Sequence, residues 1–371
     1  MKKIVVHVVG VGTIGEPLIC LLCDFKDQLG IDDITFHKNT PLTRDRAKVI
    51  SLIDRGAHLT THKDKIKDFA DIGLNVEYDI ESAIDRATVV IDCTPKGKGH
   101  ANKKEYYEKY SHNTLGFIAQ GSEFGFGKMY ARGINDSALK PEEDQFIQVV
   151  SCNTHNIAVM VKTLGMVNSW GHDNNGTRLP SSVIVESNLQ EGRFILIRRA
   201  NDISQNAGFI PAPSVDAHKD EIYGTHHAKD ASLLFNTIDV NLNLFSSSMK
   251  INSQYMHVLH FYLKLKTSTT LDKIKESLFE NDNIAVTDKM DTNEVFSFGR
   301  DHGHYGRILN QTVVSLPSLN LSNGTDITGF CFTPQDGNSL LSSVSAAMWF
   351  IDPENYEKKI QCLNKCFYDE V

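Results

Sequence analysis

Short runs of β-branched and apolar residues recur through the first 150 residues, and a small polar turn follows most of them. The first run covers residues 3–9 and leads through a glycine-rich turn into an apolar, helix-like segment over 17–25. Alternating strands and helices of this kind predict an α/β fold with a doubly wound sheet. The other predicted strands cover 33–37, 75–78, 87–92, 115–119 and 146–150, and the charged segment 44–67 is interpreted as a helix with turns.

The pattern changes after residue 151. Four later runs have the look of strands and have few helices between them, which predicts an antiparallel sheet rather than further βαβ units. These runs cover 193–199, 237–244, 257–265 and 313–316. A helix is expected over 156–167, a loop over 169–182, and a helical tail over 338–366 with one apolar side. The second half therefore predicts an α+β domain.

The turn after the first strand reads Gly10-Val11-Gly12-Thr13-Ile14-Gly15. In a dinucleotide site, Gly10 lets this turn tighten, Gly12 lets the backbone approach a pyrophosphate, and Gly15 lets the helix pack close to the strand. The helix N-terminus then offers N–H groups to the phosphates. Because the motif lies between a predicted strand and a predicted helix, dinucleotide binding is favoured over a purely structural turn.

The end of the second strand bears on which dinucleotide is bound. An NAD site usually has Asp or Glu there, to bind the ribose hydroxyls. This strand instead runs into His37-Lys38-Asn39-Thr40-Pro41, which has no acid. Lys38, with Thr40, could receive a 2′-phosphate, although Arg44 or Arg46 could serve as well, or Lys38 could simply be solvated. NADP or dual use is favoured over strict NAD.

Composition narrows the class of protein. The chain has 371 residues, a net charge of −8 and 41% hydrophobic residues, which is ordinary for a soluble protein and gives no sign of a nucleic-acid or membrane partner. Seven scattered cysteines suit a reducing cytoplasm better than a disulfide framework. Histidines and cysteines show no spacing typical of a metal site, so no metal is predicted.

One cysteine has the setting of a nucleophile. The apolar run over 146–150 is predicted to be a strand that ends just before Cys152. Cys152 then lies in a polar turn, between Ser151 and Asn153. Parallel sheets place their chemistry at the carboxyl ends of strands. A buried core thiol is the alternative. Two histidines downstream, His226 and His227, supply imidazoles that could act with the thiol.

Several motifs also follow one another in an order that is specific, although no single motif is. They are Gly10-Val11-Gly12-Thr13-Ile14-Gly15, Asp92-Cys93-Thr94-Pro95, Gln120-Gly121-Ser122-Glu123, Val149-Val150-Ser151-Cys152-Asn153-Thr154, Arg198-Arg199-Ala200-Asn201-Asp202 and Thr225-His226-His227. This order resembles the archaeal-type (type II) glyceraldehyde-3-phosphate dehydrogenases. The resemblance implies a Rossmann domain over 1–151, a catalytic domain with a mainly antiparallel sheet over 152–337, and a C-terminal helix over 338–371 that returns to the first domain. It also implies a cytoplasmic homotetramer of glycolysis.

The chemistry implied by the resemblance agrees with the residues. A Cys152 thiolate would attack the aldehyde of glyceraldehyde 3-phosphate, and His226 or His227 would take the hydroxyl proton while NADP or NAD accepts a hydride. Inorganic phosphate would then release the resulting thioester as an acyl phosphate. The cofactor positions implied or proposed are Gly10, Gly12, Thr13, Ile14, Gly15, Lys38, Thr94, Ser122, Arg199 and Gln335. The substrate positions are Ser151, Asn153, Thr154, Arg198, His227 and Ala228.

The chain departs from the family pattern next to the nucleophile. His155 stands where the family has threonine, Asn156 where it has glycine, and Ala228 where glycine follows the two histidines. His155 is interpreted as an exposed turn residue rather than a second titrating group. These departures leave two alternatives open: a related semialdehyde dehydrogenase with another substrate, or a catalytically idle NAD(P)-binding protein. The nucleophile and histidines together argue against the idle protein.

Overall fold

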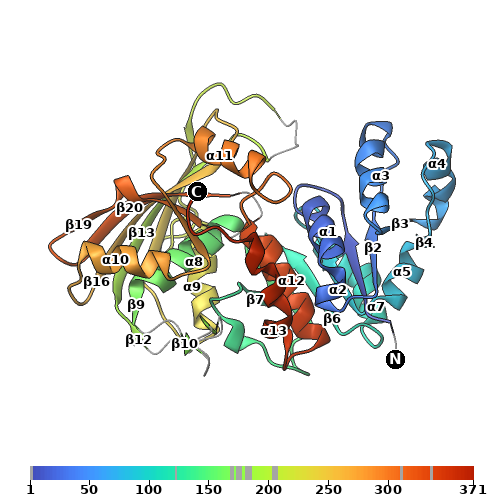
Figure 1. Cartoon of the computed structure of the whole chain (residues 1–371), viewed down its shortest axis with the longest axis horizontal. Helices are drawn as coiled ribbons and strands as arrows, with labels where there is room; N and C mark the ends of the chain where they lie inside the picture. The colour runs from blue at the N-terminus through green and yellow to red at the C-terminus, as the bar shows by residue number, and fades with distance from the viewer. Residues whose placement is uncertain are drawn as a thin grey trace. The chain divides into compact units, whose positions relative to one another are not determined.

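The computed structural model describes residues 3–121, 123–167, 171–172, 178–179, 186–202, 208–309, 312–334 and 337–371 (Figure 1). The chain divides into two compact units. The first unit comprises Met1–Lys128, Lys140–Val149 and Ser342–Lys365, and the second comprises Met129–Leu139, Val150–Leu341 and Cys366–Val371. The functional roles of the two predicted domains stay predictions.

An eight-stranded sheet forms the middle of the first unit. Its order is β4 (Tyr78–Asp79), β3 (His58–Thr61), β2 (Asp33–His37), β1 (Val5–Val9), β5 (Val89–Asp92), β6 (Gly116–Gln120), β8 (Phe146–Val149) and β7 (Lys128–Tyr130). All pairs from β4 to β8 are parallel. The chain starts in the central strand and winds outward in both directions, so the predicted doubly wound α/β fold is confirmed.

The central strands β1, β5 and β6 of this sheet are buried on both faces, which explains their largely apolar sequences. Every residue of β1 is buried, because helices cover both sides of a parallel sheet. The helices of this unit include α1 (Gly15–Asp24), α2 (Lys26–Leu29), α3 (Arg46–Asp54), α4 (Ile66–Asp71), α5 (Ile80–Arg86), α6 (Lys98–Asn102), α7 (Glu108–Tyr110), α12 (Gly337–Ile351) and α13 (Tyr356–Ile360). Figure 1 shows α13 beside α2, which it contacts. The predicted helical tail is confirmed.

Two strands of this sheet were missed, β3 and the three-residue strand β7. The segment 44–67 was predicted as helix and turns, but β3 lies within it and pairs with β2 from His58 to Thr60. This strand has only four residues, His58-Leu59-Thr60-Thr61, and three of them are polar. Its burial comes from its sheet partners and not from an apolar run, so hydrophobic pattern alone could not reveal it.

The second unit contains a mixed sheet. Its order is β14 (Ser214–Val215), β15 (Leu244–Lys250), β13 (Leu189–Arg198), β16 (His257–Leu265), β20 (Asp326–Thr333), β18 (Thr312–Ser315) and β17 (Ile284–Thr287), with β19 (Asn320–Ser322) paired to β20. Most pairs are antiparallel, as predicted, but β13–β15 and β17–β18 are parallel. Two short two-stranded sheets, β9 (Met166–Val167) with β12 (Glu186–Ser187) and β10 (Gly171–His172) with β11 (Arg178–Leu179), complete the described strands.

Helices connect both parallel pairs, so the expectation of no further βαβ units was wrong. The helices of this unit are α8 (Cys152–Gly165), α9 (His226–Asn236), α10 (Leu271–Phe279) and α11 (Thr292–Asp301). The prediction of a strand over 237–244 was also wrong, since β15 begins only at Leu244. Ile238, Val240 and Leu242 alternate like a strand because they pack on the core, but Asp239 has φ +61° and interrupts the extended backbone. The predicted loop over 169–182 lies largely outside the described residues.

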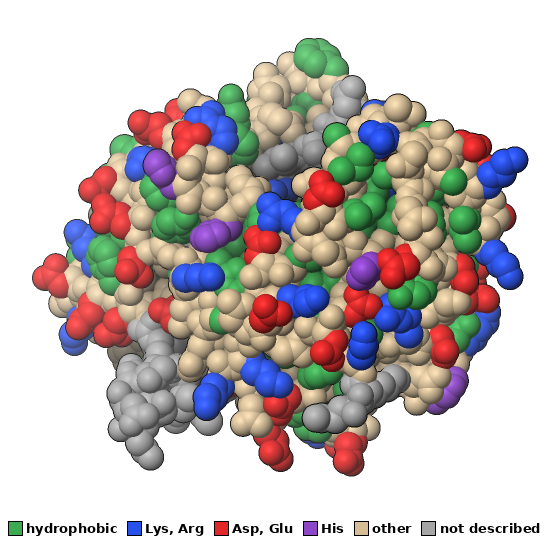
Figure 2. All heavy atoms as spheres, turned by 45° about the vertical axis from the view of Figure 1, so that its right-hand side comes forward, with side chains coloured by type: hydrophobic (Ala, Val, Ile, Leu, Met, Phe, Trp, Pro, Cys, Tyr) green, Lys and Arg blue, Asp and Glu red, His purple; other side chains and the backbone are tan. Residues whose placement is uncertain are grey.

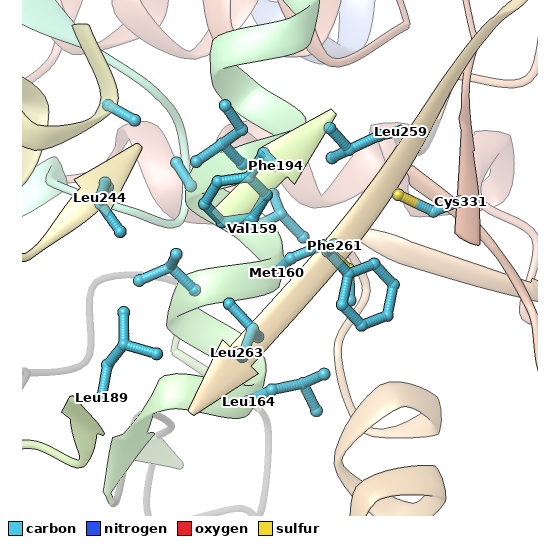
Figure 3. Close-up of a cluster of buried hydrophobic side chains, with 14 of the residues drawn as sticks. Val159, Met160, Leu164, Leu189, Phe194, Leu244, Leu259, Phe261, Leu263 and Cys331 are labelled. Atoms are coloured by element: carbon cyan, nitrogen blue, oxygen red, sulfur yellow. The ribbon is translucent and has the colours of Figure 1, made fainter. Parts of the chain in front are cut away.

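The core of the second unit lies between its sheet and α8. Figure 3 shows Val159, Met160 and Leu164 of α8 packed against strand side chains that include Phe194, Leu259, Phe261 and Leu263. Strand β16 alternates strictly, and its odd-numbered residues from His257 to Leu265 are buried. Because side chains of a strand alternate between faces, a polar residue at such a position points into the same layer as the core.

The surface carries charged side chains of both signs. Figure 2 shows acidic and basic side chains interspersed over the face in view. Among the described residues, no helix has the length and apolarity to cross a membrane. Within the same residues, no group of three or more His, Cys, Asp or Glu side chains is placed to hold a metal ion.

His7 makes the first unit sensitive to acid. Burial, and after it the nearby Arg86 charge, lowers the pKa of His7 to about 3, and only the contact with Thr35 opposes this shift. The unfolded chain binds a proton on His7 near pH 6.5, whereas the folded chain does so only near pH 3. Unfolding therefore takes up a proton between these values, and stability is lost as the pH falls from 6.5 toward 3.

We therefore expect His7→Asn to reduce the acid sensitivity of the protein. The loss of stability due to His7 between pH 6.5 and pH 4 is on the order of 3 kcal/mol, since one pKa unit corresponds to about 1.4 kcal/mol. Thermal unfolding of both proteins from pH 7 to pH 4 measures the effect. A melting temperature that falls equally in wild type and variant would show that His7 is not responsible.

Candidate active site

The glycine-rich turn of the first unit has the geometry expected of a phosphate cradle. Gly10 has φ +99°, and a Cβ on it would lie 3.1 Å from the carbonyl oxygen of Cys93. A Cβ on Gly15 would lie only 2.0 Å from the Gly10 carbonyl oxygen, so the helix packs directly on the turn. A Cβ on Gly12 would meet nothing within 4 Å. The turn is thus closed at both ends and open at Gly12, where a pyrophosphate could approach.

The other cofactor candidates of the first unit lie either in the glycine-rich turn or just after a strand. Thr13 and Ile14 belong to the turn, and Ile14 precedes the first residue of α1. Thr94 follows β5, and its backbone N–H donates to the Asp92 carboxylate at 2.9 Å, with its hydroxyl on the same oxygen. Asp92 also accepts from Tyr107 Oη at 2.6 Å, so this carboxylate organises the loop after β5. Ser122 and Gln335 lie outside the described residues.

Lys38 follows the last residue of β2, and its ammonium group is already paired. Its Nζ lies 2.6 Å from Asp45 Oδ2, and its side chain is largely buried. Arg46 is committed elsewhere, because its Nε donates to the Ile72 carbonyl at 2.8 Å. A ligand phosphate at the end of β2 would therefore meet an existing Lys38–Asp45 ion pair.

In the second unit, Cys152 is the first residue of helix α8. Ser151 is the N-cap, with extended backbone, and its hydroxyl accepts from the Thr154 N–H at 3.4 Å. The helix therefore begins four residues earlier than predicted. The positive end of the helix dipole stabilises a negative charge placed at this position, which suits a nucleophilic thiolate. Cys152 itself is half-buried.

The residues after Cys152 lie inside the helix. Asn153 and Thr154 are buried, and Asn153 Oδ1 has no hydrogen-bond partner among the described residues. His155 was interpreted as an exposed turn residue, and this was wrong, since its side chain is 1% exposed. Burial lowers the pKa of His155 to about 4, although contacts with the Ser151 and Val150 carbonyls oppose the shift. His155 is therefore neutral at physiological pH.

The two adjacent histidines begin helix α9, which packs against α8. Their rings lie 3.9 Å apart, with His226 exposed and His227 buried. His227 Nδ1 lies 3.0 Å from Thr225 Oγ1, and Ser246 Oγ accepts from the Ala228 N–H at 3.1 Å. Burial first, and then the neighbouring His226 and Arg198, hold the pKa of His227 well below its usual value. The ring is therefore neutral and keeps the unprotonated nitrogen that a general base requires, while its burial and the neighbouring charges make it a weaker base than a free imidazole.

The two arginines lie at the end of β13. Arg198 donates from Nη2 to Asp216 Oδ2 at 2.5 Å, and Arg199 donates from Nη2 to Asp202 Oδ1 at 2.7 Å. Each guanidinium keeps one buried nitrogen without a hydrogen-bond partner among the described residues: Nε of Arg198 and Nη1 of Arg199. A buried N–H group without a partner is costly, so an anionic ligand at this place would be stabilised.

A third buried histidine, His257, lies at the same end of the sheet. Its Nδ1 accepts from the Arg199 N–H at 3.1 Å. Burial first, and then Arg199, His227 and Arg198, hold its pKa well below the usual value. Sequence reasoning missed His257, although its inward position in the alternating strand β16 was a usable signal.

Strand register connects these groups to the cysteine. His257 lies opposite Thr333 in the β16–β20 ladder, and Thr333 contacts Asn156, one helical turn after Cys152. The second unit thus gathers the start of α8, the buried histidines and both arginines at one end of its sheet. The glycine-rich turn and Lys38 belong to the first unit. A thiol, neutral imidazoles, and one buried and one half-buried guanidinium group in this arrangement could support acyl transfer to and from the cysteine.

No family model matches the chain. Three known proteins that are similar to it carry the same name. The chain is 27% identical to a glyceraldehyde-3-phosphate dehydrogenase of Sulfolobus acidocaldarius, with 88% of this chain and 86% of the relative covered. A protein of the same name from Methanobacterium formicicum is 24% identical over 98% of both chains. Another from Picrophilus torridus is 28% identical over 76% of this chain and 72% of its own length.

Proposed function

Since this chain is related over most of its length to the archaeal-type glyceraldehyde-3-phosphate dehydrogenases, we propose that it is a phosphorylating dehydrogenase of glyceraldehyde 3-phosphate. The observation that carries the proposal is the position of Cys152 at the start of α8, tied through Asn156 and Thr333 to His257 and the arginines. The resident cofactor would be NADP or NAD, held at Gly10, Gly12 and the start of α1. The open space at Gly12 fits a pyrophosphate.

The proposed reaction begins when the Cys152 thiolate attacks the aldehyde carbon. A carbon–sulfur bond forms, and the carbonyl oxygen receives the proton that the thiol gave up. An imidazole at His226, His227 or His257 then takes this hydroxyl proton as hydride leaves the same carbon, which becomes the carbonyl of a thioester. The nicotinamide, when bound, supplies the acceptor for the hydride. Inorganic phosphate then attacks the thioester carbonyl, the carbon–sulfur bond breaks, and an acyl phosphate leaves. Backbone N–H groups at the start of α8 and Asn153 would steady the carbonyl oxygen and the substrate hydroxyl.

The arginines would bind the phosphate of the substrate or the attacking phosphate. Arg198 Nε and Arg199 Nη1 are buried donors without partners among the described residues, and planar guanidinium groups match phosphate oxygens. Asp216 and Asp202 hold the two side chains in place through their ion pairs. Arg199 was also proposed as a cofactor residue from the sequence, and both roles remain proposals, as do the roles of Ser151, Thr154 and Ala228.

A panel of aldehydes tests this function. The purified protein is given phosphorylated and carboxylated aldehydes with NAD or NADP, with and without inorganic phosphate, while NAD(P)H formation is followed by absorbance. We expect oxidation of glyceraldehyde 3-phosphate that depends on inorganic phosphate. Oxidation of only carboxylated aldehydes would contradict the proposed substrate.

A semialdehyde dehydrogenase is the second candidate function. The same unpartnered guanidinium nitrogens could bind a substrate carboxylate, and Asn156, one helical turn after the cysteine, departs from the family pattern. Preference for a carboxylated semialdehyde in the panel would favour this candidate. Failure of every aldehyde, with nucleotide binding retained, would favour an idle NAD(P)-binding protein. Homotetramer formation, a cytoplasmic location and a place in glycolysis stay predictions.

Lys38 and Asp45 should set the preference between the two nucleotides. We expect Lys38→Glu to weaken NADP binding by about 10- to 100-fold relative to NAD, since a charge-assisted hydrogen bond contributes about 1.5–3 kcal/mol. Asp45→Asn releases Lys38 from its 2.6 Å ion pair and should strengthen NADP binding. Fluorescence titration with both nucleotides measures the ratio of dissociation constants. An unchanged ratio in both variants would remove Lys38 from the 2′-phosphate site.

A further inference from the structure

A buried amide lies one helical turn after the proposed nucleophile. Asn156 is completely buried in α8, and the stretch from Ile157 to Val161 that follows it is apolar. Residues four apart share a face of a helix, and helical side chains lean toward the N-terminus. The Asn156 side chain therefore leans toward the turn that holds Cys152.

Both ends of this amide have partners on the sheet. Thr312 Oγ1 at the start of β18 donates to Asn156 Oδ1 at 2.5 Å. Asn156 Nδ2 donates to Thr333 Oγ1 at the end of β20 and lies 3.9 Å from Cys331 Sγ. One side chain thus joins the first turns of α8 to two neighbouring strands.

An amide in a core is costly unless its polar atoms are satisfied, and a satisfied buried network favours one arrangement over others. An apolar side chain at this position would leave both threonine hydroxyls without the amide and would let α8 settle in more than one position. The resemblance places glycine here, so this contact belongs to this chain's own sequence.

The contact between Asn156 and Thr333 connects α8 to the groups expected around the substrate. Thr333 is the cross-strand partner of His257, which accepts from the Arg199 backbone N–H at 3.1 Å. We propose that Asn156 is a positioning residue that fixes Cys152 relative to His257 and the arginines through Thr312 and Thr333. The inference rests on the proposed function, because it assigns the position of that function's nucleophile.

Cys152 has to be held in position because nucleophilic attack requires a defined geometry. A thiolate must approach the carbonyl carbon closely and in line, and a misplacement of about 1 Å can cost about 100-fold in rate. Cys152 stands at the helix end, where few helical hydrogen bonds restrain it. A side-chain clamp in the next turn supplies that restraint.

The test uses Asn156→Ala and Thr312→Val together with a matched control. Asn281 is another buried asparagine bonded to α8, because its Nδ2 donates to Thr163 Oγ1 at 2.6 Å near the other end of the helix. Asn281→Ala therefore removes a comparable buried bond far along α8 from Cys152. For each protein we would measure melting temperature, kcat, KM and the pH profile of iodoacetamide alkylation at Cys152, mapped by peptide mass spectrometry without substrate or cofactor.

We expect Asn156→Ala and Thr312→Val each to lower kcat by about 10- to 100-fold and to shift the alkylation profile, with KM changed much less. The double variant should be no worse than the worse single variant, since both remove one clamp. Asn281→Ala should lower the melting temperature and leave alkylation at Cys152 unchanged. If Asn156→Ala does not fold, Thr312→Val, which keeps the Thr333 bond, decides.

Lower melting temperatures with an unchanged alkylation profile and unchanged kcat would overturn the inference and leave Asn156 a structural residue. An equal change of alkylation in Asn281→Ala would overturn it too. If the wild-type protein oxidises no aldehyde, the proposed function fails. The alkylation profiles, which need no substrate, still show whether Asn156 sets the position of Cys152.

Discussion

Cys152→Ser should lose aldehyde oxidation while it keeps nucleotide binding. A serine hydroxyl at the start of α8 is a far weaker nucleophile than a thiolate, so we expect kcat to fall by at least about 10³-fold. The substitution changes one atom at a half-buried position, so the fold should not change. Steady-state kinetics with glyceraldehyde 3-phosphate, and fluorescence titration with NADP and NAD, measure the two properties separately.

Cys23→Ala supplies the control for this prediction. Cys23 lies in α1 of the first unit, and burial raises the pKa of its thiol to about 12, so it is not a nucleophile at physiological pH. This variant should keep full activity. Equal loss of oxidation and nucleotide binding in Cys152→Ser would instead mean that the Cys152 thiol is structural.

Removal of the catalytic imidazole should have the second-largest effect. We expect His227→Asn or His257→Asn to lower kcat by about 10²- to 10⁴-fold, which is the usual contribution of a general base. Both rings are buried and neutral at physiological pH, with neighbouring arginines that disfavour their protonation. His226 is exposed, so His226→Asn should cost less than about tenfold.

The pH dependence separates a base from a structural histidine. Because the pKa of His227 is depressed, the wild-type rate should persist well below pH 6.5, and a variant without its base should gain rate as hydroxide increases. The largest loss in His226→Asn, with both buried histidines dispensable, would contradict this assignment.

Much of the fold followed from local sequence, because strands β1 and β5 are mostly apolar runs and the glycine turn is a strict motif. Strand β16 was predicted over its full length, since its alternation is uninterrupted. The polar strand β3 escaped because pairing, and not composition, buries it. The false strand over 237–244 shows the converse, since alternation can also arise where loop residues pack on a core.

The candidate site was predictable only in part. Motif order selected Cys152, the histidine pair and the arginines, and the structure places these residues of the second unit at one end of its sheet. His257 was missed because its role depends on its cross-strand neighbour Thr333 and on the Arg199 N–H, both distant in sequence. His155 was misplaced because the helix begins at Cys152, four residues earlier than the apolar pattern indicated.

The measurement closest to the central claim is a search for the acyl adduct. The protein is mixed with glyceraldehyde 3-phosphate and NADP or NAD without inorganic phosphate, quenched in acid, digested and analysed by peptide mass spectrometry. A thioester at Cys152 forms on the proposed path, and added phosphate should remove it before the quench. NAD(P)H formation with no adduct at Cys152, or with the adduct on another cysteine, would contradict the account.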